Sequence, residues 1–275
     1  MTASPSAPRE KAFSRNDAEL LTVVMCWGLN LPIAKFALAD LSPLAYNGLR
    51  FGTATAILCA VMLTRRSRGA SRIGRRDIVS MALLGLVGHA AYQVFFIEGL
   101  ARTTATHCAL IFGVTPVLVA LLSFALGHER PGALVWTGAL VAFGGIYVIV
   151  AGEPPPGGPA PTAAGDLLIL AATLCWAVYT STSRPVLVRH PALEVTSLTM
   201  AWGSLVLIPA CVPSLVRQPW GSVGPAAWGA TLYGMLFPLV VAYLLWYRSI
   251  RSVGSVRTSI YSNLVPVVGA LAGWL

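Results

Sequence analysis

Charged side chains are scarce in this chain of 275 residues: Asp, Glu, Lys and Arg make up 11% of it, whereas 56% is hydrophobic. That is more apolar surface than one soluble core of this length needs to bury. The apolar runs are continuous and do not alternate with polar residues, so the strands of a membrane β-barrel are excluded. The composition therefore predicts an all-α polytopic membrane protein.

Motifs of catalysis and metal binding are also missing. The sequence contains no CxxC, HExxH or GxSxG, and its five cysteines lie inside apolar runs, as small packing residues do. The four histidines have no Ser or Asp at a catalytic spacing. We therefore expect no catalytic residue, no metal site and no cofactor. The net charge of +9 lies mostly in short gaps between apolar runs, which does not favour a nucleic-acid partner.

Long apolar runs are what the sequence has instead. About 20 helical residues cross a hydrocarbon core of about 30 Å, and nine runs bounded by charges, Pro or Gly approach that length. The predicted spans are 18–39, 43–64, 77–100, 104–126, 132–151, 166–188, 194–214, 225–247 and 256–275.

Two halves of the chain resemble each other across a Pro/Gly-rich linker at 152–165. Cys26-Trp27 recurs as Cys175-Trp176 at an offset of 149 residues, and Pro116 recurs as Pro266 at an offset of 150. Five spans in a repeat is an odd number, so the second copy must be inserted upside down. We predict two inverted five-helix repeats.

The repeats are expected at 18–151 and 166–275, after a tail at 1–17. The second repeat shows four of its five spans, because the sequence stops just before the position equivalent to Leu126. We therefore expect a ten-helix fold of which nine spans are visible.

The distribution of basic residues predicts the orientation. Counting alternate connections from the N-terminal tail places fifteen Lys and Arg residues on one side, whereas the other side holds only Arg102 and Arg217. Because basic residues are retained in the cytoplasm, the N-terminus is predicted to be cytoplasmic. The first apolar run is too long for a signal peptide, so we expect a multi-pass protein of a bacterial inner membrane.

Several motifs together resemble a known family, the drug/metabolite transporter superfamily, in its branch of EamA-type ten-helix exporters. They are WGLNLPIAK (27–35), SPLAYNGLRF (42–51), EGLARTTATHCALIFGVTPVLVALLS (98–123) and LGHE (126–129). The resemblance covers the chain from about residue 18, and it implies export of amino acids or similar metabolites.

Polar and aromatic side chains at membrane depth are the candidates for binding a small molecule, because they are costly there unless they face protein or water. Aromatic walls with scattered amides and hydroxyls suit an amphipathic organic solute. The candidate substrate-binding residues are Trp27, Asn30, His89, Tyr92, Gln93, Trp176, Tyr179, Tyr243, Trp246, Tyr261 and Asn263. The candidate hinges, where proline removes a helical hydrogen bond, are Pro32, Pro116, Pro238 and Pro266.

Acidic residues are absent from the centres of the predicted spans. Glu98 lies inside a span near its end, where Arg102 at i+4 is its expected ion-pair partner. Proton-coupled carriers commonly hold a central carboxylate, so its lack favours a facilitator. His89 is the one titratable alternative, although a hydrogen-bonded core histidine fits the pattern equally well.

The sequence thus predicts a secondary transporter that exports amino acids or related metabolites by alternating access, with the lipid bilayer as its surroundings. Two alternatives stay open. A transporter fold can serve as a non-transporting scaffold or receptor, because fold does not fix function. An intramembrane enzyme is the weaker alternative, since no catalytic motif is present.

Overall fold

The computed structural model describes residues 14–65, 73–127 and 162–274, together with six isolated positions between 132 and 144. Most of the predicted span 132–151, most of the linker 152–165 and residues 1–13 of the tail lie outside the described residues. Everything described is helix or short connection, and six helices are long and apolar enough to cross a membrane. The all-α prediction is confirmed.

Five of the six long spans match the predicted ones to within three residues at each end, and the last ends at Val253 where 247 was predicted. Two of them are interrupted near their middle by one turn of π-helix, η1 and η3. The spans are α1 (Arg15–Asp40), α2 (Pro43–Arg65), α3 (Arg75–Gly85) with η1 (Leu86–Ala91) and α4 (Tyr92–Arg102), α8 (Ala163–Arg189), α9 (Ala192–Arg217), and α10 (Pro225–Met235) with η3 (Leu236–Val241) and α11 (Ala242–Val253).

Two predicted spans are not single helices. Residues 104–126 form α5 (Ala105–Phe112) and α6 (Thr115–Ala125), separated by a turn at Gly113. Residues 255–274 form α12 (Ser255–Ile260), the 3₁₀ turn η4 (Tyr261–Leu264) and α13 (Val265–Trp274). The prediction of unbroken helices here was wrong, because hydropathy stays high through both breaks.

The prolines of these broken spans sit at helix starts. Pro116 and Pro266 are each the second residue of a new helix, α6 and α13. A proline in a first turn replaces an N–H that has no helical acceptor anyway. The expectation that these two prolines loosen a helix interior was therefore wrong, whereas Pro32 lies inside α1 and Pro238 inside η3. A hinge role for any of them stays a prediction.

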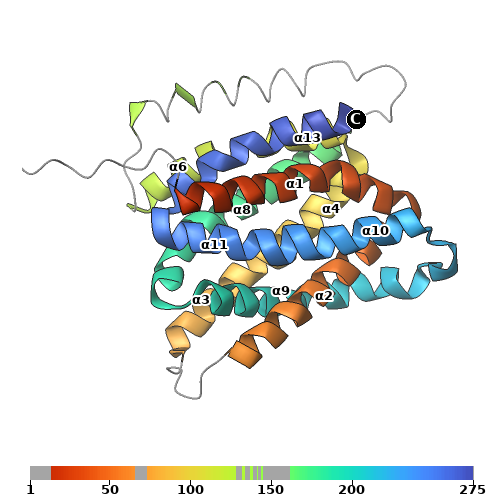
Figure 1. Cartoon of the computed structure of the whole chain (residues 1–275), viewed down its shortest axis with the longest axis horizontal. Helices are drawn as coiled ribbons and strands as arrows, with labels where there is room; N and C mark the ends of the chain where they lie inside the picture. The colour runs from red at the N-terminus through yellow and green to blue at the C-terminus, as the bar shows by residue number, and fades with distance from the viewer. Residues whose placement is uncertain are drawn as a thin grey trace, which may run out of the picture.

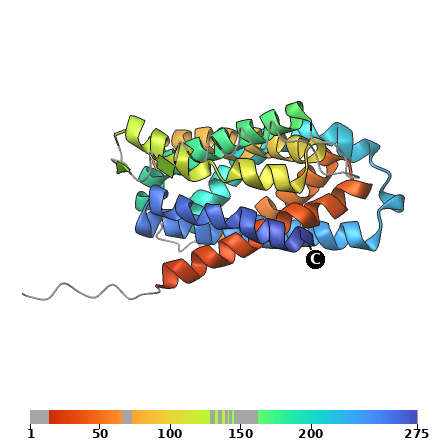
Figure 2. The same cartoon turned by 90° about the horizontal axis from the view of Figure 1, so that it is seen from above.

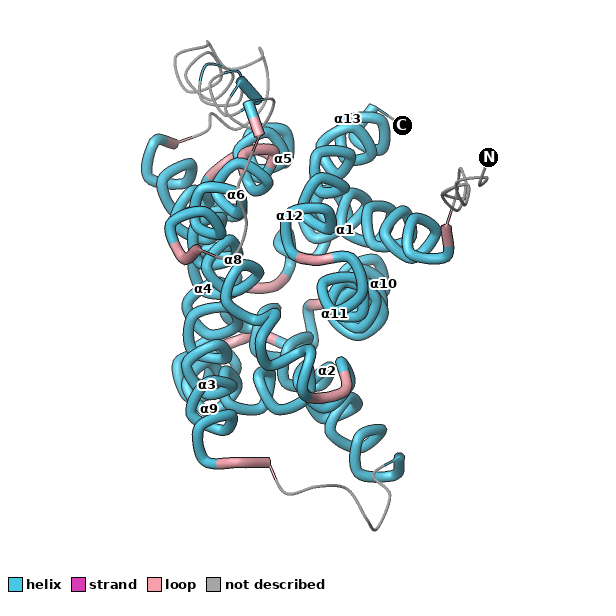
Figure 3. The backbone as a smooth tube through the Cα atoms, turned by 90° about the vertical axis from the view of Figure 1, so that its left-hand side faces the viewer, coloured by secondary structure: helices cyan, strands magenta, loops and turns pink. Residues whose placement is uncertain are grey.

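The helices form two facing layers (Figures 1 and 2). Seen end-on in Figure 3, one layer holds α5, α6, α8, α4, α3 and α9, and the other holds α12, α13, α1, α10, α11 and α2. Helices that correspond by the repeat offset lie in opposite layers: α1 corresponds to α8, α2 to α9, and α3–α4 to α10–α11. Each layer is thus completed by the first two helices of the other half.

The two halves run in opposite directions through the bundle. Lys35, near the end of α1, donates to the Thr103 carbonyl at 2.6 Å, and the Thr103 hydroxyl donates to Asp166, near the start of α8, at 2.5 Å. The end of α1 therefore lies beside the beginning of its counterpart α8. This antiparallel relation is what an inverted repeat requires.

Residues related by the repeat touch one another. The hydroxyls of Thr55 and Ser204, 149 positions apart, are 3.0 Å apart. The Gln93 amide donates to the Tyr243 hydroxyl, 150 positions away, at 3.2 Å. A residue that contacts its own counterpart lies on the axis relating the two copies. The internal repeat predicted from sequence is therefore a pseudo-twofold arrangement in space.

Close packing around η1 depends on glycine. A Cβ added at Gly88 would lie 1.9 Å from Cδ2 of Tyr179. We expect Gly88→Ala to lower the free energy of unfolding by about 1–3 kcal/mol, because the ring has no room to retreat in a packed core. Thermal unfolding in detergent would measure it, with Gly74→Ala as control, since nothing lies within 4 Å of a Cβ there. Equal stability of both variants would contradict this packing.

Candidate functional site

A cavity lies between the two layers, halfway along the spans. Its walls include Trp27 of α1 and Trp176 of α8, each at the midpoint of its helix, and the residues directly after the π turns η1 and η3. Single π turns are rare and are frequent at functional sites. The cavity leaves about 60 Å³ for the centres of water molecules, which is room for several waters.

Aromatic side chains from both halves line the cavity. The two indoles of Trp27 and Trp176 meet edge to face with centroids 5.4 Å apart. The Trp27 indole N–H donates to the Pro238 carbonyl in η3 at 3.1 Å, which fixes that ring against the opposite half. We call the following set the aromatic wall: Trp27, Tyr92, Phe96, Phe112 and Trp176.

Arg50 is the one charged side chain among the described residues that line the cavity. Arg50 of α2 is 1% exposed, and its guanidinium donates to the side-chain oxygen of Gln93 at 2.7 Å. The amide nitrogen of Gln93 donates onward to the Tyr243 hydroxyl, and its backbone carbonyl accepts from Asn47 at 3.0 Å. The amide of Gln93 thus joins an arginine of the first half to a tyrosine of the second.

A layer of rings closes the cavity on one side. Tyr179, Trp246, Tyr247 and His89 each lie about one turn beyond a lining residue, towards the face where α1 begins. We call this the N-terminal face; it also holds the end of α8 and the start of α3. All four side chains are buried, and their rings contact one another or Trp176 and Tyr243 within 6.5 Å.

His89 belongs to this closing layer and does not line the cavity. It is fully buried between the rings of Phe51, Tyr179 and Tyr243, and its Nε2 lies 3.1 Å from the Thr199 hydroxyl. Its other ring nitrogen has no hydrogen-bond partner among the described residues. This is the environment of a neutral core histidine.

The structure brings together most of the residues predicted from the sequence. Six of the eleven line the cavity: Trp27, Asn30, Tyr92, Gln93, Trp176 and Tyr243. His89, Tyr179 and Trp246 pack directly behind them.

Tyr261 and Asn263 lie apart from the other nine. The Tyr261 hydroxyl donates to Asp17 at the start of α1, at 2.5 Å, and Asn263 is exposed on the outside of η4. Their neighbour Ser262 lines the cavity instead. The 3₁₀ turn rotates the side chains away from the positions that a continuous α-helix would give them.

Arg50 was not among the predicted site residues. Its sequence position carried a usable signal, because an arginine inside a predicted span is costly at membrane depth and is a functional candidate by default.

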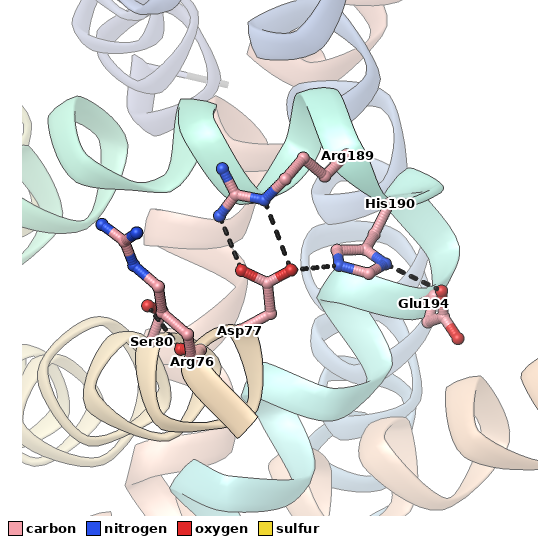
Figure 4. Close-up of polar contacts among 6 residues, drawn as sticks. All are labelled: Arg76, Asp77, Ser80, Arg189, His190 and Glu194. Carbon is pink, nitrogen blue, oxygen red and sulfur yellow. Dashed lines mark hydrogen bonds and ion pairs between the residues drawn. The ribbon is translucent and has the colours of Figure 1, made fainter. Parts of the chain in front are cut away.

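Polar contacts join the two halves at the N-terminal face (Figure 4). Asp77 of α3 accepts from Arg189 at 2.7 and 3.3 Å and contacts the His190 ring at 2.7 Å, while His190 lies 3.6 Å from Glu194. Both partners of Asp77 come from the end of α8. We call these four residues the N-terminal latch.

A second set closes the opposite face. Asp166 of α8 accepts from the Thr103 hydroxyl at 2.5 Å and lies 3.1 Å from His107 of α5. Beside it, Arg102 pairs with Glu98, as the sequence predicted. The structure therefore shows the cavity with contacts between the halves at both ends.

Inverted halves that meet around a cavity at mid-membrane define the architecture of secondary transporters. The chain belongs to the EamA-like transporter family, whose model matches residues 18–151 and 163–275. The resemblance drawn from the sequence motifs is confirmed.

Curated relatives carry transporter names. The uncharacterized transporter YyaM of Bacillus subtilis is 28% identical over 88% of this chain and 79% of its own length. An uncharacterized transporter of Archaeoglobus fulgidus is 27% identical over 92% of this chain and 87% of its own. A probable terminal-alkyne amino-acid exporter of Streptantibioticus cattleyicolor is 28% identical over 93% and 83%.

A solved crystal structure shares the fold. It aligns with a TM-score of 0.68 at 20% identity, covering 93% of this chain and 86% of the other. At that identity the likeness supports the fold alone.

Proposed function

We propose that this transporter exports amino acids or related small organic metabolites across a bacterial inner membrane by alternating access between its two halves. The observation that carries the proposal is the central cavity, whose walls come from both halves and meet at repeat-related residues such as Trp27 and Trp176. A rocking of one half against the other opens such a cavity to either side in turn. The printed name of the Streptantibioticus relative supports the substrate range.

The orientation is part of the proposal. Arginines cluster at the ends of α2 and α11 and at the start of α3, all at the N-terminal face, which suits the cytoplasm. With that orientation, the buried ring layer and the N-terminal latch separate the cavity from the cytoplasm. The described conformation is then one that follows solute uptake from inside and precedes release.

The mechanism we infer is facilitated diffusion. No acidic residue is among those that line the cavity in the described part of the chain. His89, the remaining candidate for a proton carrier, does not line the cavity and packs against the rings of Tyr179 and Tyr243. Solute binding and rocking therefore proceed without a titrating group in contact with the solute.

Replacing His89 by glutamine is expected to leave the response to a pH gradient unchanged. Glutamine keeps a hydrogen-bonding group for Thr199 but cannot carry a proton. We expect solute movement at within about threefold of the wild-type rate, equally with and without the gradient, because only packing is altered. Gradient-driven accumulation that the substitution abolishes would assign proton coupling to His89.

Counterflow of radiolabelled amino acids into proteoliposomes tests the proposed function. Saturable exchange of one solute class would support a carrier. If no solute in the panel moves, a scaffold or receptor with a transporter fold becomes the better hypothesis. Empty liposomes and liposomes with heat-inactivated protein provide the controls.

A further inference from the structure

Arg50 is a buried cation without a carboxylate. No ion pair joins it to an acidic residue in the described part of the chain, and its Nε atom is buried without an acceptor there. What it has is the neutral oxygen of Gln93 and the faces of two rings, Tyr46 at 5.0 Å and Phe96 at 5.6 Å.

The acidic residues of the described chain are all engaged elsewhere. Each hydrogen bonds or pairs at a helix end with a group other than Arg50. They are Asp17 with Tyr261, Glu19 with Arg248, Asp40 with Gly224, Asp77 with Arg189, Glu98 with Arg102, Asp166 with Thr103 and Glu194 with His190. None of these seven acidic residues therefore serves as the counterion of Arg50.

The position of Arg50 at the cavity shows where a counterion from a solute can bind. Arg50 lies on the cavity surface, where a solute has access to it. A buried cation at this depth is unfavourable until it is neutralised, and guanidinium binds carboxylate through two parallel hydrogen bonds. One Nη atom already donates to Gln93, which orients the plane of the guanidinium, and the buried Nε has no acceptor among the described residues.

The rest of the cavity suits the remainder of such a solute. The aromatic wall and Leu31, Leu239 and Val265 offer apolar surface for a ring or an alkyl chain. The described residues that line the cavity include no carboxylate to hold a positively charged group. Recognition therefore centres on an anion and an apolar body.

Resting on the proposed function, we propose that Arg50 is the solute's anion receptor and that this carrier selects apolar carboxylates, for which an amino group is dispensable. The carboxylate binds the Arg50 guanidinium in place of a protein counterion, while the apolar body lies against the aromatic wall. Inorganic phosphate fits poorly, because it has no apolar body to lie against the aromatic wall.

Three ligands with the same ring and chain separate the requirements: phenylalanine, 3-phenylpropionate, which lacks the amino group, and phenethylamine, which lacks the carboxylate. Binding to the full chain in nanodiscs is followed by the fluorescence of tryptophans excited selectively. We expect the two carboxylates to bind with dissociation constants within about fivefold of each other and phenethylamine at least about tenfold more weakly. Tighter binding of the amine than of phenylpropionate would overturn the proposal.

Substitutions then assign the effect to Arg50. Arg50→Gln should weaken binding of both carboxylates at least about tenfold and leave phenethylamine unchanged, whereas Arg50→Lys should lose less because it keeps the charge. Arg248→Gln is the matched control, a half-exposed arginine paired with Glu19 at 3.2 Å. Equal carboxylate binding by wild type and Arg50→Gln would overturn the proposal.

The proposed anion receptor and the proposed carrier function can be contradicted independently. If carboxylates bind through Arg50 but none exchanges across proteoliposomes, the proposed carrier function fails while the anion receptor stands. If solutes exchange without a carboxylate requirement, the carrier stands and the anion receptor fails. If no carboxylate shows saturable binding up to about 10 mM, the anion-receptor proposal is wrong whatever the transport result.

Discussion

Replacing Gln93 by leucine is expected to lower the transport rate about 10- to 150-fold and the free energy of unfolding by about 1.5–3 kcal/mol. Leucine fills the same space but accepts no hydrogen bond, so the Arg50 guanidinium loses its partner at 2.7 Å and the Tyr243 hydroxyl loses its donor at 3.2 Å. Counterflow and thermal unfolding of the purified variant would measure the two effects.

Glutamate at the same position separates the two effects. Gln93→Glu supplies Arg50 with a carboxylate inside the protein, so stability should equal or exceed that of wild type. The same carboxylate occupies the anion receptor, so transport of apolar carboxylates should fall at least as far as in Gln93→Leu. A glutamate variant that is stable and transports normally would contradict the role assigned to the Arg50–Gln93 pair.

Replacing Asp77 by asparagine is expected to open the cavity towards the N-terminal face. Asparagine keeps the shape but removes the charge that holds Arg189 and His190 (Figure 4). These groups are partly exposed, so we expect a loss of about 1–2 kcal/mol for the whole N-terminal latch, which shifts the ratio of the two conformations about 5- to 30-fold.

Cysteine labelling detects that shift. A cysteine in place of Ser262 on the cavity wall, in a background with Cys26 and the four other native cysteines replaced, reports access from the N-terminal face in inside-out vesicles. Maleimide should react 5- to 30-fold faster when Asp77→Asn is added. Arg65→Gln, at the same face, should leave the rate unchanged. Identical rates in all three proteins would show that the N-terminal latch does not hold the cavity closed.

Hydropathy predicts the long spans well because each side chain of a lipid-facing helix contributes to it. The limits of α1, α2 and α8 differ by a few residues from the predicted 18–39, 43–64 and 166–188. Hydropathy does not detect a change of backbone geometry within an apolar run. The break at Gly113 and the π turns η1 and η3 therefore escaped prediction, although they decide which side chains face the cavity.

The candidate site was predictable where a helix continues regularly. Trp27 and Asn30 share one face of α1, and both line the cavity. Prediction failed after the 3₁₀ turn, where Tyr261 and Asn263 face away. It also missed Arg50, although an arginine within a span is a functional candidate by default. What the spacing along one helix does not show is the neutral amide that a second helix brings to this arginine.

The contacts between repeat-related residues bear on how the two halves of this fold arose. If one five-helix ancestor paired with an upside-down copy of itself, each residue on the axis met its own twin. The Trp27–Trp176 contact and the hydroxyl pair of Thr55 and Ser204 preserve that arrangement after fusion into one chain. The position equivalent to Arg50 is Thr199, which binds His89 instead. The two repeat-related walls thus differ at this pair of positions, and the proposed anion receptor belongs to one half alone.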